Sequence, residues 1–187
     1  MSGEIQQTVP DPQELMSLLG RIQRRSRESM LRVPQMQIND DLWDGLAYSI
    51  AGVRVVTAMR EIREMLPYPN QLTRVPGAHE WVKGLANVRG NLLPVIDLQL
   101  FFGVKAVVPR KTARMLVVRM RGLECGLLVS SVQGMRHFKE ETRVANALMQ
   151  GALGRYVYDA FSVDGEIWPI FSLSALTADP DFRSAAV

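Results

Sequence analysis

The chain has little of the chemistry that most binding and catalytic sites need. Its 187 residues contain one cysteine, Cys125, so a disulfide framework is excluded. The two histidines, His79 and His137, lie far apart, and with one cysteine they cannot supply the four ligands of a structural zinc site. The sequence therefore predicts no metal site.

Long apolar runs are also missing. No stretch reaches the roughly 18 apolar residues of a membrane-spanning helix. The N-terminus has neither the basic start nor the apolar core of a signal peptide. We therefore expect a cytoplasmic protein that does not insert into the membrane.

Catalytic motifs are absent from the sequence. It contains no G-x-S-x-G, no glycine-rich phosphate loop and no G-x-G-x-x-G. Cys125 stands in an apolar segment, which favours a small buried thiol over a nucleophile. Asp97 follows an apolar run and precedes a short helical segment, so we interpret it as a helix N-cap. The sequence predicts a protein that is not an enzyme and binds no cofactor.

The net charge of +3 does not by itself indicate a nucleic-acid-binding protein. After residue 45 the basic residues are scattered singly along apolar segments, whereas nucleic-acid binding needs a clustered basic face with stacking aromatic residues. We therefore predict no nucleic-acid partner.

Residues 1–44 differ in texture from the rest and are interpreted as an N-terminal extension. Asp11 and Pro12 resemble a helix start, and the leucines that follow share one stripe of an amphipathic helix over about 12–31. Such a helix either packs on the remaining domain or docks a partner, and the sequence favours packing without excluding docking.

From Leu46 onwards, short alternating runs flank two-residue turn signals. Four such pairs of runs are separated by Ala51-Gly52, Gly90-Asn91, Arg121-Gly122 and Asp164-Gly165. Glycine beside a polar residue accepts the positive φ angles of tight hairpins. Four hairpins predict a mainly β architecture of barrels or a sandwich.

The hairpins also repeat in pairs. Residues 92–98 resemble residues 167–173, and each segment contains a residue that can cap a short helix, Asp97 or Ser172. The hairpin around Gly52 resembles the one around Gly122. We call the hairpins around Gly52, Gly90, Gly122 and Gly165 A, B, A′ and B′ in chain order. This repeat predicts two related β subdomains of about 65 residues each. They should pack on one another, because each alone buries only a marginal core.

Trp81–Gly90, followed by Leu93–Leu98, resembles the signature of the CheW-like domain, which is roughly G-[VIL]-x-N-[LV]-R-G and then P-[VI]-[VIL]-D-L. The resemblance spans about residues 45–178 and leaves 179–187 as a tail. It implies two five-stranded SH3-like β-barrels packed together, here with the N-terminal helix added. The W-V-K-G-x-A-N-V-R-G variant resembles the CheW-like adaptors of type IV pilus chemosensory systems.

Members of this family are adaptors. The resemblance implies two partners, the signalling tip of a methyl-accepting chemoreceptor and the regulatory domain of a CheA-type histidine kinase. It also implies recruitment to membrane-associated receptor arrays and control of twitching motility. A flagellar chemotaxis adaptor, or a small-molecule sensor on the same fold, remains as an alternative.

The resemblance implies receptor contacts at Arg89, Ile62, Glu64, Gly84, Asn87, Met115 and Leu116. Residues that contact the kinase cannot be assigned from the sequence. We further hypothesise that Glu64 and Arg89 pair across adjacent strands, so that the acid orients the arginine.

Overall fold

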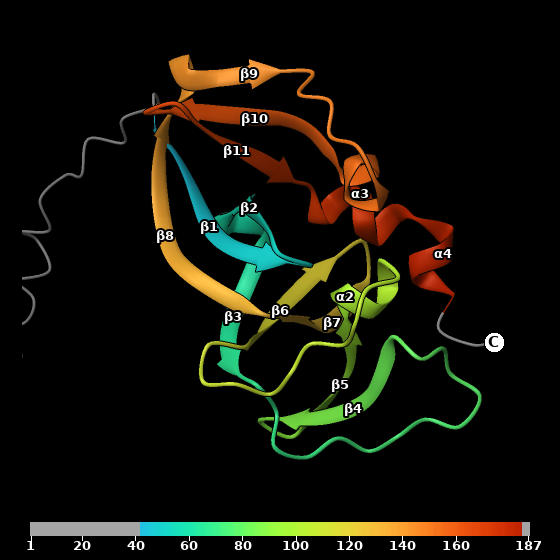
Figure 1. Ribbon diagram of the computed structural model, residues 1–187. Coiled ribbons are helices and arrows are strands. Elements are labelled where there is room, and N and C mark those ends of the chain that lie inside the picture. The colour runs from blue at the N-terminus through green and yellow to red at the C-terminus, as the bar shows by residue number, and fades with distance from the viewer. Residues whose placement is uncertain (1–41, 185–187) are drawn as a thin grey trace, which may run out of the picture. The chain divides into compact units, whose positions relative to one another are not determined.

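The computed structural model describes residues 42–184 (Figure 1). The chain divides into two units, 1–40 and 41–187, and the helix expected over 12–31 lies outside the described residues. The described part is mainly β, as predicted, with two curved sheets and a few short helices.

The six strands of the first sheet are β1 (Leu42–Ile50), β2 (Val53–Ala58), β8 (Ser131–Lys139), β9 (Arg143–Ala145), β10 (Val157–Val163) and β11 (Glu166–Phe171). They lie in the order β8-β1-β2-β11-β10-β9. This sheet forms what we call the second barrel, and its sixth strand, β9, is only three residues long.

The five strands of the other sheet are β3 (Ile62–Pro67), β4 (Val82–Val88), β5 (Asn91–Asp97), β6 (Arg114–Met120) and β7 (Leu123–Val129). They lie in the order β3-β6-β7-β5-β4 and form the first barrel. The helices are η1 (Met59–Glu61), α2 (Leu98–Phe101), η2 (Glu140–Thr142), η3 (Ala152–Tyr156), α3 (Leu173–Ala178) and α4 (Pro180–Arg183).

The two barrels exchange parts of the repeat. Hairpin β1–β2 joins hairpin β10–β11 through the parallel pairing of β2 with β11, and hairpin β4–β5 joins β6–β7 through β5 with β7. In repeat notation, A pairs with B′ and B pairs with A′. The chain passes from the second barrel into the first at β3 and returns at β8, so the first barrel is one continuous segment, residues 62–129, between the two parts of the second.

Apolar side chains form three cores. One lies inside the first barrel and includes Val95, Met115 and Val117. The second barrel holds an aromatic core of four side chains, those of Trp43, Phe138, Phe161 and Trp168. The largest core is shared and takes side chains from both sheets and from α2, α3 and α4. The apolar surface buried between the barrels thus adds the hydrophobic stabilisation that a barrel of this size cannot provide alone.

Three of the four predicted hairpin turns are confirmed, and the fourth is displaced by one residue. The β4–β5 turn is Arg89-Gly90, with φ of 51° and 85°, and not Gly90-Asn91. Asn91 instead begins β5, opposite Val88. Two consecutive positive φ values mark the turn that matches the right-handed twist of paired strands.

The packed part of the chain is longer than the expected 45–178. Phe182 of α4 is 2% exposed and packs in the shared core, so the segment after residue 178 is not simply a tail. At the other end, β1 begins at Leu42, and Trp43 packs against the aromatic core of the second barrel.

Both predicted helix caps are confirmed. The Asp97 carboxylate accepts hydrogen bonds from the backbone N–H groups of Gln99 and Leu100, and the Ser172 hydroxyl accepts one from Ala175. These caps start α2 and α3 at equivalent places in the two halves of the repeat. They satisfy helix N–H groups that would otherwise be buried without partners.

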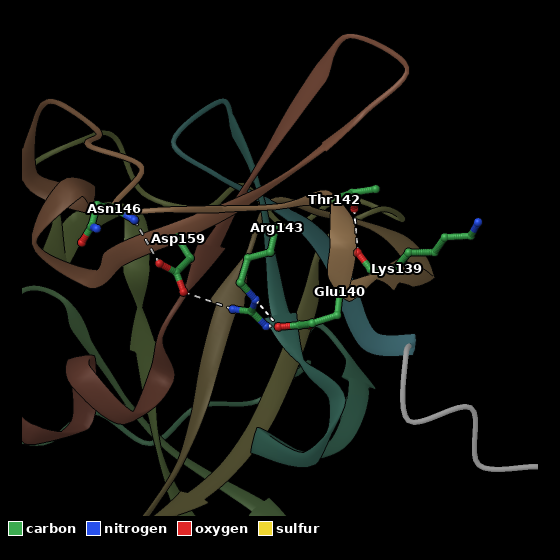
Figure 2. A network of polar contacts seen from close by, with 6 residues as sticks. All are labelled: Lys139, Glu140, Thr142, Arg143, Asn146 and Asp159. Atoms are coloured by element: carbon green, nitrogen blue, oxygen red, sulfur yellow. Dashed lines mark hydrogen bonds and ion pairs between the residues drawn. The ribbon is translucent and has the colours of Figure 1, made fainter.

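Polar contacts join the connection between β8 and β10 to strand β10 (Figure 2). The Arg143 guanidinium contacts the Asp159 carboxylate at 3.1 Å and the Glu140 carboxylate at 2.5 Å. The other Asp159 oxygen accepts a hydrogen bond from the Asn146 N–H at 3.2 Å. Arg143 also lies 5.0 Å from the ring centre of Phe161. The connection from β8 to β10 is therefore tied to the barrel wall.

Candidate interaction surface

Arg89 and Glu64 form an ion pair on the first barrel, with Nη2 and Oε1 2.6 Å apart. The predicted pair is confirmed, but the strands are not adjacent, because β3 and β4 are the two outer strands of their sheet. The sheet curls into a barrel and brings these edges together. The arginine side chain is 77% exposed and the glutamate 24%, so the acid is fixed and the cation faces solvent.

The turn that carries Arg89 is built by its neighbours. The Asn87 side-chain oxygen accepts a hydrogen bond from the Gly90 N–H at 2.8 Å. The φ angle of Arg89 is 51°, in the positive region that residues other than glycine rarely adopt. Asn87 therefore fixes the turn that presents Arg89.

Gly84 allows the β3–β4 connection to approach the backbone of β4 closely. Thr73 and Leu85 exchange two backbone hydrogen bonds, of 2.9 and 2.8 Å, which tie the β3–β4 connection to β4. A Cβ atom on Gly84 would lie 2.3 Å from the Thr73 carbonyl oxygen, and the φ of Gly84 is 135°. Only glycine allows this close approach.

A bulge in β3 separates Ile62 from Glu64. Ile62 lies opposite Val118, whose side chain belongs to the shared core, whereas Glu64 lies opposite Val117, which belongs to the first-barrel core. Cross-strand partners share a face, so the two side chains point to opposite sides of the sheet. The structure therefore does not bring Ile62 onto the surface of the Arg89–Glu64 pair.

An open cleft of about 590 Å³ lies beside Arg89. Asn87, Val88 and Met115 contribute to its lining, together with the start of the β3–β4 connection. Met115 is 2% exposed, so it forms part of the wall and core at once. Leu116 points the other way and is fully buried in the shared core, where it offers no surface to a partner.

Sequence reasoning missed the other wall of this cleft. It is formed by residues 66–71, which include Tyr68 and the prolines on either side of it. This connection has no apolar periodicity from which a surface could be predicted. Leu92 was also missed. It lies opposite Asn87 on β5 and is 68% exposed.

The repeat supplies an internal comparison for Arg89. The equivalent turn of the second barrel is Asp164-Gly165, with the same φ of 51° at its first residue. Asp164 makes no ion pair within residues 42–184, so this part of the fold does not require one. The Arg89–Glu64 pair is thus a feature added to one barrel.

The remaining candidate groups are structural. Burial raises the pKa of the Cys125 thiol to about 12, so it stays protonated and unreactive at neutral pH, as expected for a buried thiol. Among residues 42–184 no group of His, Cys, Asp and Glu side chains is arranged to hold a metal ion. None of the helices in that range is long and apolar enough to cross a membrane.

Two interlocked barrels with this signature turn define a known class of protein. The family profile of the CheW-like domain matches residues 44–181, and the chain belongs to this family. A solved structure, the scaffolding protein TtCheW of Thermoanaerobacter tengcongensis, has the same fold. Its TM-score is 0.62 with 23% identity, over 70% of this chain and 89% of that one.

Three curated relatives differ in how much of the chain they match. Protein PilI of Pseudomonas aeruginosa is 35% identical over 96% of this chain and 100% of its own length. The chemotaxis protein CheW of Helicobacter pylori is 33% identical, but over 49% of this chain and 54% of its own. That of Rhizobium meliloti is 35% identical over 41% and 47%. The similarity to PilI alone among these three extends over nearly the whole chain.

Proposed function

We propose that this protein is a non-catalytic signal-transduction adaptor of a type IV pilus chemosensory system. It couples the signalling tip of a methyl-accepting chemoreceptor to the regulatory domain of a CheA-type histidine kinase, in the cytoplasm at membrane-associated arrays. Full-length similarity to PilI supports the pilus system over a flagellar one.

The exposed Arg89 cation, oriented by Glu64 beside the cleft, is the observation that carries this proposal. An exposed ion pair contributes only about 0–1 kcal/mol to folding, so stability does not explain it. A positioned guanidinium beside a partly apolar cleft suits a helical partner, which supplies apolar side chains and a carboxylate. A chemoreceptor tip is such a helical partner.

In this arrangement the seven candidate residues divide by role. Arg89 lies at the contact surface, and Met115 forms part of the cleft wall beside it. Glu64, Asn87 and Gly84 hold this surface in position. Ile62 and Leu116 support the sheet from the shared-core side. Binding energy comes from the apolar part of the cleft wall, and the arginine sets the register of the partner.

Calorimetric titration tests the proposal. The protein is titrated with a receptor signalling tip and, separately, with the kinase regulatory domain. Arg89→Glu is expected to weaken tip binding at least tenfold and to leave kinase binding within twofold. Arg121→Glu is the matched control, because Arg121 occupies the same turn position in hairpin β6–β7, with φ of 50°. Equal losses in both variants, or no binding of either partner by the folded wild type, would overturn the proposal.

A further inference from the structure

The connection between α2 and β6, residues 103–113, has a fixed backbone. The Val104 N–H donates to the Gln99 carbonyl at 2.8 Å, and the Val107 N–H donates to the Asp97 carboxylate at 2.7 Å. A turn is closed by the Ala113 N–H and the Arg110 carbonyl at 3.0 Å. These bonds give the connection one shape before any partner arrives.

Within residues 42–184, the exposed charged side chains of this connection have no ionic partners. Lys105, Arg110 and Lys111 are exposed, and none forms an ion pair with another residue of 42–184. Arg114, at the start of β6, is half-buried and donates to the carbonyls of Lys111 and Ala113. Asp97 is the carboxylate beneath the connection. It is fully buried, and its bonds go to backbone N–H groups.

A connection of the second barrel, between β8 and β10, is different (Figure 2). Between β8 and β10 each cation has an acidic partner: Lys139 contacts Glu141, Arg143 contacts Glu140 and Asp159, and Arg155 contacts Asp179 and Asp181. The three cations of the 103–113 connection thus differ from those between β8 and β10, which all have acidic partners.

Charge is divided unequally between the barrels. Residues 62–129, which hold the first barrel, contain ten Lys and Arg against four Asp and Glu, a net charge of +6. Within them, residues 98–123 contain six Lys or Arg and no Asp or Glu. The described second-barrel segments, 42–61 and 130–184, contain seven Lys and Arg against nine Asp and Glu, a net charge of −2. The excess of positive charge therefore belongs to the continuous segment that forms the first barrel.

Two valines stand among these cations. Val104 is 41% exposed and Val108 is 57% exposed. We propose that the 103–113 connection is a docking surface for an acidic polypeptide segment of a partner protein, one whose carboxylates alternate with apolar side chains. The lysines and arginines meet the carboxylates and the valines meet the apolar groups.

A polypeptide fits better than the other anionic partners. Single-stranded nucleic acid binds through aromatic side chains on which bases stack, and the exposed apolar residues here are aliphatic. Basic segments that bind anionic membranes carry clusters of about four to eight cations, whereas three cations are exposed in this connection. The fixed backbone also sets a spacing between charges that a polypeptide can match.

The test uses the full chain and a fluorescein-labelled twelve-residue peptide, Glu-Glu-Leu repeated four times. The triple variant Lys105→Ser, Arg110→Ser and Lys111→Ser is expected to bind the peptide at least tenfold more weakly than the wild type. Arg114 is kept because it braces the backbone. The control, Arg74→Ser, Arg121→Ser and Arg183→Ser, removes the same charge from exposed positions elsewhere and should stay within threefold. Circular dichroism confirms that both variants are folded.

Three results would overturn the proposal. The peptide fails to bind the wild type, or the two triple variants lose affinity equally, or Arg89→Ala abolishes peptide binding and thereby places it on the other surface. Vesicles with 30% phosphatidylserine and a twenty-nucleotide poly-dT strand are measured in parallel. Tighter binding of either through the same three residues would assign the surface to that class instead, whereas preference for the peptide supports the proposal.

Discussion

Glu64 and Arg89 lie on opposite outer strands of one sheet, yet their charged atoms are 2.6 Å apart. Only the curl of the first barrel brings them together. The pair joins the two outer strands, β3 and β4, beside the cleft. It can therefore have two roles, to hold the barrel closed and to orient the arginine. The two roles can be separated.

A charge swap separates them. Glu64→Arg with Arg89→Glu retains an ion pair beside the cleft but exchanges the position of the cation. If the partner recognises the cation at position 89, the swap is expected to weaken receptor-tip binding at least tenfold, as the single Arg89→Glu does. The free energy of unfolding should change by less than about 1 kcal/mol, because the pair is exposed. Full recovery of tip affinity in the swap would show that closure of the barrel is what matters.

Two glycines near the site give a matched pair for stability. In Gly90→Ala the added Cβ has no atom within 4 Å, so the only cost is that alanine disfavours positive φ. This should lower the free energy of unfolding by about 1–2 kcal/mol. Gly84→Ala adds a clash with the Thr73 carbonyl oxygen and disrupts the Thr73–Leu85 hydrogen bonds, so we expect it to cost clearly more. Urea unfolding of both variants measures the difference, and equal costs would contradict the close approach at Gly84.

Asp97 is expected to matter more than an ordinary cap. A lost N-cap costs about 1 kcal/mol, and a buried N–H left without an acceptor costs about 1–3 kcal/mol. Because Val107 also donates to this carboxylate, Asp97→Ala should destabilise the protein by about 2–4 kcal/mol. Asp97→Asn can keep the cap bonds, but its amide nitrogen cannot accept a hydrogen bond from Val107. Its free energy of unfolding should therefore lie between those of the wild type and Asp97→Ala. Chemical denaturation decides, and an alanine cost near 1 kcal/mol would reduce Asp97 to a simple cap.

Acid should weaken the attachment of the C-terminal helices. The Tyr156 hydroxyl donates to the Asp179 carboxylate at 2.6 Å, and this bond chiefly lowers the pKa of Asp179, with help from the Asp181 N–H and Arg155. A lowered folded-state pKa gives stability that is complete above the unfolded value of about 3.9 and is lost as pH falls through the folded value.

The free energy of unfolding of the wild type should therefore drop below about pH 4 more steeply than that of Asp179→Asn, which has no carboxylate to protonate. Thermal unfolding between pH 6 and pH 2 measures both slopes. Parallel curves would mean that Asp179 contributes nothing to the acid sensitivity.

Local signals in the sequence predicted much of this fold. The four hairpins, the two caps and the repeat all follow from residues close together in the chain, such as Asp97 before its short helix or Ala51-Gly52 between two apolar runs. The exchange of hairpins between barrels did not follow, because A–B–A′–B′ is compatible with continuous and with swapped halves. Parallel pairing of β5 with β7 depends on long-range packing that no local pattern encodes.

The site was predictable to a similar depth. The motif identified Arg89, and opposite charge suggested Glu64 as its partner. The bulge that turns Ile62 away from Glu64 and the irregular wall at residues 66–71 carry no local signal. The sequence shows the cations of the 103–113 connection only as separate basic residues, and the fold adds that they form no ion pair within residues 42–184.

The central claim is that one molecule of this protein connects two partners, and a bridging measurement tests it most directly. The receptor signalling tip is immobilised for surface plasmon resonance, and the kinase regulatory domain is passed over it with and without the protein. We predict that the kinase domain is retained only when the protein is present, and that Arg89→Glu abolishes this retention while Arg121→Glu does not. Retention of the kinase domain without the protein, or failure of the folded wild type to bridge the two, would contradict the account.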